Sequence, residues 1–397
     1  MMIYAGIDVA KYEHHLSIID DQGTVLLADL EFLNNREGFL TAQATLDNAR
    51  TADGQVQVGL ENTGHYGYNL ISYLRQHKFQ VFAYNPLLIK KYIQANTLRH
   101  TKTDPQDALE IAKKLRSDTT KVSFEADADI IELKSDTRYL EGLKRKRVKT
   151  KLAFTNVLDQ EFPELAPNLG PVSAKYSQWL LALLKRYPST DKLAHGRINT
   201  MTNIITKYSM KQHGEEMAIK VRELARETIG QASDSLSFQL LQLIDALQFE
   251  TQQIKEADQK IHKIMNRIKT PLLSIPGVGE TLAAIILAEI RNVNYFQSPN
   301  QILAFAGAEP SIIRSGEMQG NYGHMVKHGS TQLRWALFQA ARLCAMYSPT
   351  MRAYYQKKRS EGKPYLVALS HVVKKLVRII YHILKYNDPW SETVIRD

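Results

Sequence analysis

The first 125 residues alternate between short apolar runs and amphipathic stretches, in an order that restricts the possible folds severely. Three runs with strand character come first and are joined by short turns, which predicts an antiparallel meander. Helical and strand patterns then alternate, so the order of elements is βββαβαβα. Crossovers of this kind place strand ends together at one edge of a sheet. The strands are expected at 2–9, 15–20, 23–32, 55–61 and 79–84, and the helices at 36–48, at 66–77, from 87 and from 105.

That order is the order of the ribonuclease H-like fold, a mixed sheet with helices on both faces, which we predict for residues 1–125. A long helix is expected next. Further along the chain, apolar residues recur with a heptad period that Glu250 interrupts, which predicts a coiled coil or a helical hairpin. We therefore expect an α/β domain followed by all-α parts: a helical and coiled-coil region at 126–268 and a helical C-terminal domain at 269–397. The heptad positions are Leu240, Leu247, Ile254 and Ile261, with Leu243, Ala257 and Ile264 in the second seam.

The charge of the chain favours a polyanionic partner. Lys and Arg outnumber Asp and Glu by 51 to 41, which gives a net charge of +10 and suits DNA, RNA or a membrane surface. No apolar run reaches the roughly 18 residues that a membrane span needs, and we expect no secretory signal. The one cysteine, Cys344, is expected to be a buried thiol, which fits a reducing cytoplasm. These features favour a cytoplasmic protein that binds nucleic acid and no membrane.

Four acids are expected to meet at one edge of the predicted sheet. Asp8 and Glu61 end two neighbouring strands, and Asp104 and Asp107 open a helix that crosses them, with Pro105 at the first helical position. Clustered carboxylates repel one another unless a cation neutralises them. Oxygen ligands without a Cys or His cluster favour Mg²⁺ or Mn²⁺. Any single acid could instead form a turn or cap a helix, but the joint placement predicts a metal site.

These residues resemble those of a known family. The phrases GIDVAK, GLENTG, YNP and KTDPQDA are similar to segments of DEDD-type bacterial insertion-sequence transposases, and the match extends through FPEL to the last domain. The resemblance implies that Asp8, Glu61, Asp104 and Asp107 form the DEDD tetrad of a domain similar to a Holliday-junction resolvase. It also implies that the enzyme cuts and rejoins DNA at the element ends and target, and that a structured guide RNA encoded by the element chooses the sites. The resemblance further implies that the tetrad of one protomer meets the serine domain of another. Recombination between two duplexes implies homodimers that join into a homotetramer.

A glycine-rich loop at 305–334 contains the candidate nucleophile. From residue types alone Ser315 is an ordinary loop serine, because spacing reveals no His/Asp partner that would activate it. The resemblance implies a catalytic role, because the family holds its serine in a Ser-Gly pair and Ser315-Gly316 matches that pair. Downstream, a Lys-x-Gly…Leu-Arg segment also matches, although position 330 is Ser where the family pattern has Asn. Ser311 and Ser330 are the competing candidates.

Several segments are expected to contact nucleic-acid phosphates. Ile-Pro-Gly-Val-Gly between apolar stretches is a helix-hairpin-helix pattern that can bind a phosphate through backbone N–H groups, or an ordinary tight turn. The stretch 138–151 carries seven basic residues and one acid, which suits a phosphate contact and equally a solvated helix surface. The aromatic and basic run 354–359 could clamp nucleic acid or form a packed helix end, and His14 and His15 are expected in an exposed turn. The residues expected to bind nucleic acid are Gly277, Gly279, Lys144, Arg145, Lys146, Arg147, Arg314, Lys327 and Arg334.

Three rival functions fit parts of the sequence. A Holliday-junction-type endonuclease would hydrolyse DNA with the tetrad and leave Ser315 idle. A non-catalytic scaffold would bind nucleic acid without metal. A sugar-kinase-like ATPase begins with a similar Gly-x-Asp strand, although no adenosine-loop glycines are evident. The prediction that joins most features is a transposase in which the tetrad holds Mg²⁺ or Mn²⁺ and Ser315 attacks phosphorus.

Overall fold

The computed structural model of the chain describes residues 2–50, 55–61, 66–84, 89–90, 92–94, 104–118, 127–309, 314–315, 318–319 and 325–392. The chain divides into two compact units, Met1–Ala126 and Asp127–Asp397. Across the described ranges, no helix is both long and apolar enough to span a membrane.

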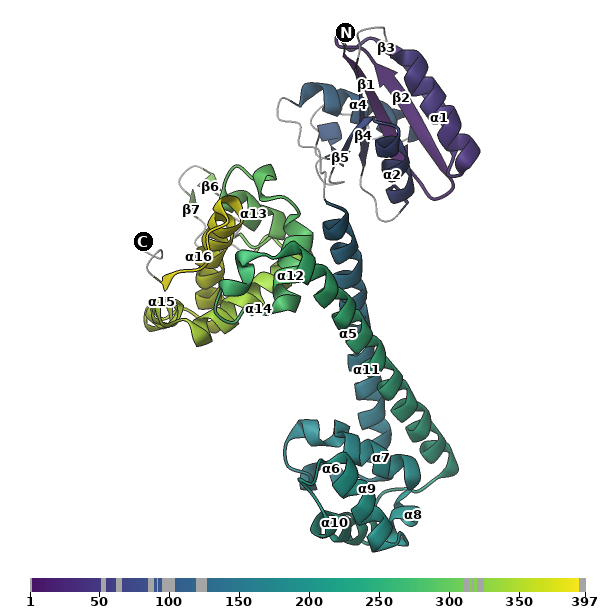
Figure 1. Ribbon diagram of the computed structural model, residues 1–397, viewed down its shortest axis with the longest axis vertical. Helices are drawn as coiled ribbons and strands as arrows, with labels where there is room; N and C mark the ends of the chain where they lie inside the picture. The colour runs from purple at the N-terminus through teal and green to yellow at the C-terminus, as the bar shows by residue number, and fades with distance from the viewer. Residues whose placement is uncertain are drawn as a thin grey trace. The chain divides into compact units, whose positions relative to one another are not determined.

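The first unit is built on a five-stranded mixed sheet with the strand order β3-β2-β1-β4-β5 (Figure 1). The first three strands pair antiparallel, whereas β4 is parallel to both β1 and β5. This confirms the predicted mixed α/β architecture. The strands are β1 (Ile3–Val9), β2 (Glu13–Ile19), β3 (Val25–Leu33), β4 (Val56–Glu61) and β5 (Gln80–Tyr84).

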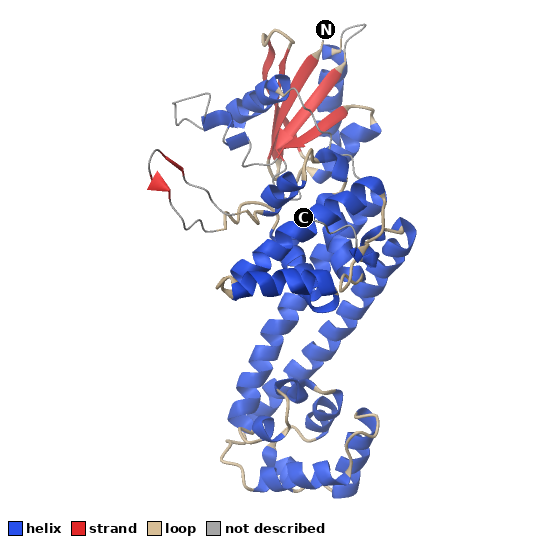
Figure 2. Ribbon diagram, turned by 90° about the vertical axis from the view of Figure 1, so that its left-hand side faces the viewer, coloured by secondary structure: helices blue, strands red, loops and turns tan. Residues whose placement is uncertain are grey.

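The two faces of this sheet differ because side chains alternate along a strand. The odd-numbered residues of β1, from Ile3 to Val9, are buried in an apolar core that they share with α1 (Arg36–Ala49) and α2 (Tyr68–Gln76). The opposite face is covered by α4 (Asp104–Ser117). Helices therefore lie on both faces of the sheet (Figures 1 and 2).

The second unit is organised around two long helices, α5 (Ala128–Glu161) and α11 (Asp234–Ile268), which pack along each other (Figure 1). They run antiparallel: near the start of α5 Asp129 pairs with Arg267 at 2.5 Å, and farther along Thr150 bonds to Glu250 at 2.9 Å. The predicted heptad seam is confirmed as the core of this hairpin, except that Leu243 is only partly buried. The buried residues of α11 are Leu240, Ile244, Leu247, Glu250, Ile254, Ala257, Ile261, Ile264 and Met265.

Glu250, which interrupts the heptad pattern, lies in the seam with an exposed fraction of 1%. Its Oε1 accepts a hydrogen bond from the Thr150 hydroxyl at 2.9 Å and lies 3.6 Å from Nζ of Lys146. Its Oε2 is buried and has no hydrogen-bond partner in the described chain. A polar residue buried in such a seam specifies the register of the two helices at a cost in stability.

We expect Glu250→Leu to raise the free energy of unfolding of the second unit by about 1 kcal/mol or more, because an apolar side chain replaces an incompletely bonded buried carboxylate. Thr150 keeps a hydrogen bond to the carbonyl oxygen of Lys146 at 3.2 Å, so its hydroxyl stays satisfied. Thermal unfolding followed by circular dichroism measures the change, with Glu256→Leu on the exposed side of α11 as the control. A melting temperature below that of the wild type contradicts this assignment.

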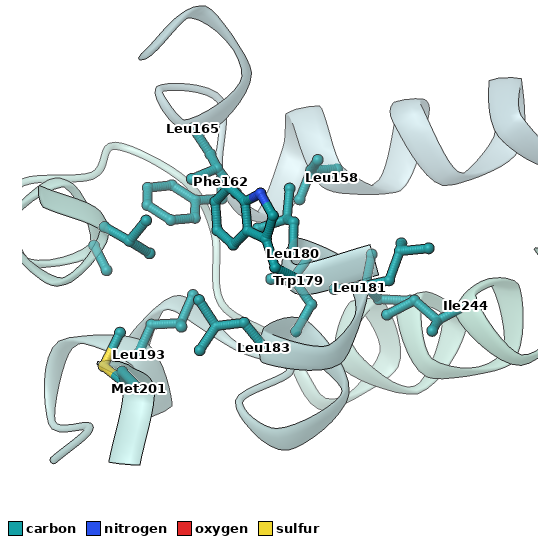
Figure 3. Close-up of a cluster of buried hydrophobic side chains, with 14 of the residues drawn as sticks. Leu158, Phe162, Leu165, Trp179, Leu180, Leu181, Leu183, Leu193, Met201 and Ile244 are labelled. Carbon is teal, nitrogen blue, oxygen red and sulfur yellow. The ribbon is translucent and has the colours of Figure 1, made fainter. Parts of the chain in front are cut away.

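The helices between α5 and α11 fold into a small domain, here called the helical tip (residues 162–233). Trp179 and its neighbours on α7 pack against Phe162 from the end of α5 and Met201 of α9, in a core that also includes Ile244 of α11 (Figure 3). The region is helical, as the sequence predicts for 126–268. Its helices are α6 (Leu165–Asn168), η1 (Val172–Tyr176), α7 (Gln178–Arg186), α8 (Thr190–Ala194), α9 (Ile198–Tyr208) and α10 (Glu215–Arg226).

The C-terminal part of the second unit is helical, as predicted. Cys344 is fully buried, and this burial raises the pKa of its thiol to about 12, which confirms a core thiol. Phe296 and Gln297 accept hydrogen bonds from the hydroxyl of Tyr381 through their carbonyl oxygens, at 3.1 and 3.2 Å. The elements are η2 (Pro271–Ser274), α12 (Glu280–Ile290), η3 (Val293–Tyr295), α13 (Pro299–Ala306), β6 (Arg314–Ser315), β7 (Met318–Gln319), α14 (Thr331–Tyr347), α15 (Pro349–Ser360) and α16 (Tyr365–Tyr386).

Candidate functional site

Asp8 and Glu61 lie at the ends of two neighbouring parallel strands. The register pairs Ile7 of β1 with Leu60 of β4, and both side chains are fully buried in the apolar core. Because side chains alternate along a strand, the next residues, Asp8 and Glu61, face the side of the sheet that α4 covers. Both are half-buried. The strand ends therefore bring two of the four predicted carboxylates to one face and one edge.

Glycines two residues before these acids allow α4 to lie directly on this face. A Cβ at Gly6 would collide with the backbone carbonyl oxygen of Ala108 and the backbone nitrogen of Ala112. On the neighbouring strand, a Cβ at Gly59 would lie only 3.3 Å from the side chain of Ile111. A side chain at Gly6 would lift the helix, and one at Gly59 would crowd the side chains beneath it. The two glycines therefore let α4 lie close to the sheet beside both acids.

The first turn of α4 carries the other two predicted carboxylates. Asp107 directly precedes Ala108 and has an exposed fraction of 8%, whereas Asp104 is exposed. The Ser17 hydroxyl on β2 donates to the carbonyl oxygen of Ala28 at 2.7 Å and lies 3.5 Å from the carbonyl oxygen of Pro105, so the helix begins over β2. Among the described residues, no three His, Cys, Asp or Glu side chains are gathered closely enough to hold a metal ion. Asp8 and Glu61 thus lie on the face of the sheet, and Asp104 and Asp107 lie on the helix that covers it. In the described residues the four carboxylates do not form one cluster.

His14 and His15 lie within β2 and are buried, so the prediction of an exposed turn is wrong. The strand begins two residues earlier than expected, and the turn is closed by a hydrogen bond from the Ala10 N–H to Nδ1 of His14 at 3.3 Å. His15 pairs with Asp8 across the strands, and its Nδ1 lies 2.9 Å from Oδ1 of Asp29. The pair of His15 and Asp29 therefore lines the same face as Asp8.

Burial lowers the pKa of His14 below its ordinary value. The unfolded chain then binds a proton more readily than the folded one. The contribution of His14 to stability is therefore complete above the unfolded pKa and is lost as the pH falls from there through the lower folded pKa. We expect β1 and β2 to lose protection from hydrogen exchange between about pH 8 and about pH 5. His14→Phe, which keeps the contact with the ring of Phe39, should reduce that loss. His77→Phe changes an exposed histidine and should leave that loss of protection unchanged. An equal loss in the wild type and in both variants would rule out His14 as the cause.

Ser315 is the last residue of β6 in a two-stranded antiparallel ribbon. Strand β6 pairs with β7 in the register Arg314↔Gln319 and Ser315↔Met318. The backbone of Ser315 therefore lies opposite that of Met318. Gly316 and the competing Ser311 lie outside the described residues, as do the side chains of Arg314 and Ser315.

The competing candidate Ser330 has a hydroxyl that is already engaged. Its Oγ accepts a hydrogen bond from the Leu333 N–H at 3.1 Å as the N-cap of α14, and it donates to Oε2 of Glu289 at 2.8 Å. Its backbone N–H donates to the carbonyl oxygen of Phe305 at 2.9 Å. These bonds anchor the end of the glycine-rich loop to α12 and α14.

Glu289 of α12 is the centre of a buried ionic network that our sequence analysis did not predict. Its side chain has an exposed fraction of 1%, and its carboxylate lies 3.0 Å from Nε of Arg138 and 3.7 Å from Nζ of Lys134, both on α5. Burial lowers the pKa of Lys134 to about 8, and the negative charge of Glu289 opposes this shift. Together with Ser330, the network joins α5, α12 and the start of α14.

The two ends of the glycine-rich loop are held together by close backbone packing. Gly307 and Gly329 have positive φ values of 63° and 125°, and a Cβ on either would collide with the backbone of the opposite end. The Arg334 guanidinium donates to the carbonyl oxygens of Ala306 at 2.9 Å and Lys327 at 3.2 Å. The side chain of Lys327 is exposed. Of these two predicted phosphate ligands, Arg334 therefore has a structural role as well, and Lys327 presents its charge to solvent.

Gly277 and Gly279 form the turn that precedes α12. Gly277 has a φ of 82° and packs against the backbone of Leu343, so a side chain there would clash. Gly279 is the N-cap of α12 and has open space around it. Two features differ from the expected helix-hairpin-helix: the preceding helix is only the short 3₁₀ helix η2, and the first turn of α12 carries Glu280, which pairs with His262 at 2.6 Å. A carboxylate at this position competes with a phosphate for the positive end of the helix.

Cations of α5 that were expected to bind nucleic acid are partly paired with acids. Lys144 and Lys146 lie 3.9 and 3.6 Å from acids of α11, and Arg145 pairs with Glu141 at 2.9 Å. Arg147 makes no ion pair within the described chain. The positive charge of this stretch is therefore reduced by intramolecular pairing.

Comparison with known proteins places these features in a family context. A model described as a transposase matches residues 5–163, and one described as the transposase IS116/IS110/IS902 family matches residues 269–356. The insertion element IS110 uncharacterized 43.6 kDa protein of Streptomyces coelicolor is 25% identical over 96% of this chain and 94% of its own length. A mini-circle putative transposase for IS117 from the same organism is 24% identical, over 99% and 96%. A pilin gene-inverting protein of Moraxella bovis is 23% identical, over 98% of each chain.

Proposed function

The chain belongs to the IS110 family of transposases, and on that premise we propose that it moves an insertion sequence with two groups of residues, a metal-binding carboxylate tetrad and a serine nucleophile. The observation that carries the proposal is the placement of Asp8 and Glu61 on one face of the sheet, beneath the helix whose first turn carries Asp104 and Asp107. The strand order 3-2-1-4-5 supports a ribonuclease H-like fold for residues 1–125.

The four acids suit a hard divalent cation, because they offer only carboxylate oxygens. We assign Asp8, Glu61, Asp104 and Asp107 as the residues that would hold Mg²⁺ or Mn²⁺. When bound, such an ion supplies positive charge to the oxygens of the reacting phosphate. Asp8 and Glu61 are fixed by the strand ladder, and Asp107 by its burial, so these three would set the position of the site.

Ser315 is the proposed nucleophile. Its oxygen forms a bond to phosphorus as the bond from phosphorus to a strand oxygen breaks; the serine gives up its proton and the departing strand oxygen gains one. The phosphoserine link conserves a phosphoester, so a strand hydroxyl can reverse the step and rejoin DNA without an added energy source. Arg314, Lys327 and Arg334 are proposed to hold the phosphate through charge.

A structured guide RNA and the pairing of homodimers into a homotetramer belong to the same proposal. Lys327 and Arg147 support a contact with nucleic acid, because the side chain of Lys327 is exposed and Arg147 makes no ion pair in the described chain. Lys144, Arg145 and Lys146 would need to exchange intramolecular pairs for phosphates. The boundaries at 126 and 269 are proposed as limits of the helical and coiled-coil region.

The experiment that tests this function separates serine transfer from hydrolysis. The full chain is incubated with element-end duplexes, the adjacent transcribed RNA and Mg²⁺ in water enriched in ¹⁸O. We expect rejoined strands whose phosphates contain no ¹⁸O, because the serine and not water attacks phosphorus. Cut ends that carry ¹⁸O, without rejoined strands, would identify a Holliday-junction-type endonuclease instead. DNA binding without any cut product would identify a scaffold.

A further inference from the structure

The positive charge of the chain is concentrated in one segment. Residues 318–387 contain twelve Lys and Arg and a single acid, Glu361, which leaves 39 Lys and Arg against 40 Asp and Glu in the rest of the chain. The net charge of +10 therefore comes entirely from these 70 residues. Neither α15 nor α16 contains an Asp or Glu.

One side of α16 is buried and the other carries cations. Val373, Leu376 and Ile380 are buried, whereas Lys374 and Arg378 are exposed. Together with Lys385, these two cations follow the spacing i, i+4, i+11, so the three lie on one stripe about 16 Å long.

The end of α15 joins this stripe through an aromatic ring. Tyr354 of α15 has Nζ of Lys375, from α16, at 4.8 Å from its ring centroid and Nζ of Lys358 at 5.6 Å. Lys358 also pairs with Glu361 at 2.8 Å, whereas Lys357 is exposed. Both helices thus contribute to one surface, here called the α15–α16 cationic face. Its members are Lys357, Arg359, Lys374, Lys375, Arg378 and Lys385.

Like charges held close together repel one another, and the described chain does not neutralise them. No acid of the described residues forms an ion pair with Lys357, Lys374, Lys375 or Arg378. The pKa of His371 on α16 is lowered by burial and by the positive charges of Lys363, Lys358 and Lys374. The negative charge of Glu361 opposes this shift. Glu361 therefore does not cancel the positive charge around His371.

We propose that the α15–α16 cationic face binds the phosphate backbone of double-stranded DNA. A duplex carries one negative charge per about 1.7 Å of its axis, which suits a stripe of several cations. The ring of Tyr354 is occupied by two ammonium groups, and Tyr355 packs edge-on against Tyr365 at 6.3 Å. Rings used in this way do not offer the open stacking surface that single strands require. None of the residues of the α15–α16 cationic face is part of the proposed tetrad or is Ser315, so the proposal does not depend on the proposed chemistry.

The test measures affinity for a short duplex of unrelated sequence by fluorescence anisotropy, with the full chain and with EDTA present. Excluding Mg²⁺ makes the result independent of cleavage, so a failure here differs from a failure of the proposed function. The variant combines Lys357→Gln, Lys374→Gln and Arg378→Gln. We expect the slope of log K against log salt to fall in magnitude by about 2 to 3, because three phosphate contacts are lost. The dissociation constant at low salt should rise by about tenfold or more.

A matched control removes the same charge elsewhere. Lys192→Gln, Lys207→Gln and Lys211→Gln change three exposed cations of the helical tip and should leave the slope nearly unchanged. An unchanged slope in the face variant, or an equal loss in both variants, would overturn the proposal. The proposal would also be overturned if the face variant lost affinity only for single-stranded DNA or duplex RNA in parallel titrations. If the triple variant does not fold, Lys374→Gln and Arg378→Gln are tested singly. Each should reduce the magnitude of the slope by about 0.9.

Discussion

Asp8→Asn and Glu61→Gln should each reduce strand cleavage and rejoining by at least about a hundredfold, which is the largest change in activity that we expect. Each substitution keeps the size of the side chain and removes the negative charge that would hold a divalent cation. Both residues are half-buried at strand ends, in a ladder that fixes their backbone, so the loss should arise from the missing charge and not from unfolding. Formation of recombinant junctions from element-end duplexes, with RNA and Mg²⁺, measures the effect.

The matched control is Glu37→Gln in α1. This acid is exposed and belongs to the helix on the other face of the same sheet, so its loss should leave recombination unchanged. Circular dichroism of all three variants checks that the first unit still folds. Near-normal recombination by Asp8→Asn and Glu61→Gln would show that these acids do not hold the metal of the reaction.

The second large effect concerns stability. Glu289→Leu should destabilise the second unit by about 3–5 kcal/mol, because it leaves the charges of Arg138 and Lys134 beside an apolar side chain and removes the acceptor of the Ser330 hydroxyl. The network joins helices that are far apart in sequence, so its loss should also loosen the anchored end of the glycine-rich loop. Chemical denaturation followed by tryptophan fluorescence measures it, because all three tryptophans of the chain belong to the second unit.

Glu280→Gln provides the control on the same helix. Glu280 and its partner His262 are both exposed, with 39% and 55% of their side chains accessible, so this substitution should cost less than about 1 kcal/mol. Equal effects of Glu289→Leu and Glu280→Gln on the denaturation midpoint would contradict the view that the buried network holds α12 to α5.

Much of the first unit follows from local patterns. The strands around Asp8 and Glu61 were predictable because their apolar residues alternate with period two, and the glycines before both acids marked a close approach of backbone. The position of His14 and His15 was not predictable in the same way. A turn of only three residues places both in β2, and nothing in the local sequence distinguishes this turn from a longer one.

The second unit shows why pairing is harder to predict than position. The heptad pattern indicated that α11 packs along a partner, but the partners of Glu250 and of Lys144 depend on how α5 is aligned with it. Glu289 offered a signal, because it is an acid in the apolar stretch LAAIILAEI, and a buried acid requires a partner. Its partner Arg138 lies 151 positions away, which a single sequence does not reveal.

The most direct test of the central claim is covalent trapping. The full chain is incubated with labelled element-end DNA, the adjacent transcribed RNA and Mg²⁺, and is then run on a denaturing gel beside Ser315→Ala, Ser330→Ala and Asp8→Asn. The account predicts a protein–DNA adduct with the wild type and with any folded Ser330→Ala, and none with Ser315→Ala or Asp8→Asn. Cleavage that persists in Ser315→Ala without any adduct would contradict it and leave a metal-dependent nuclease.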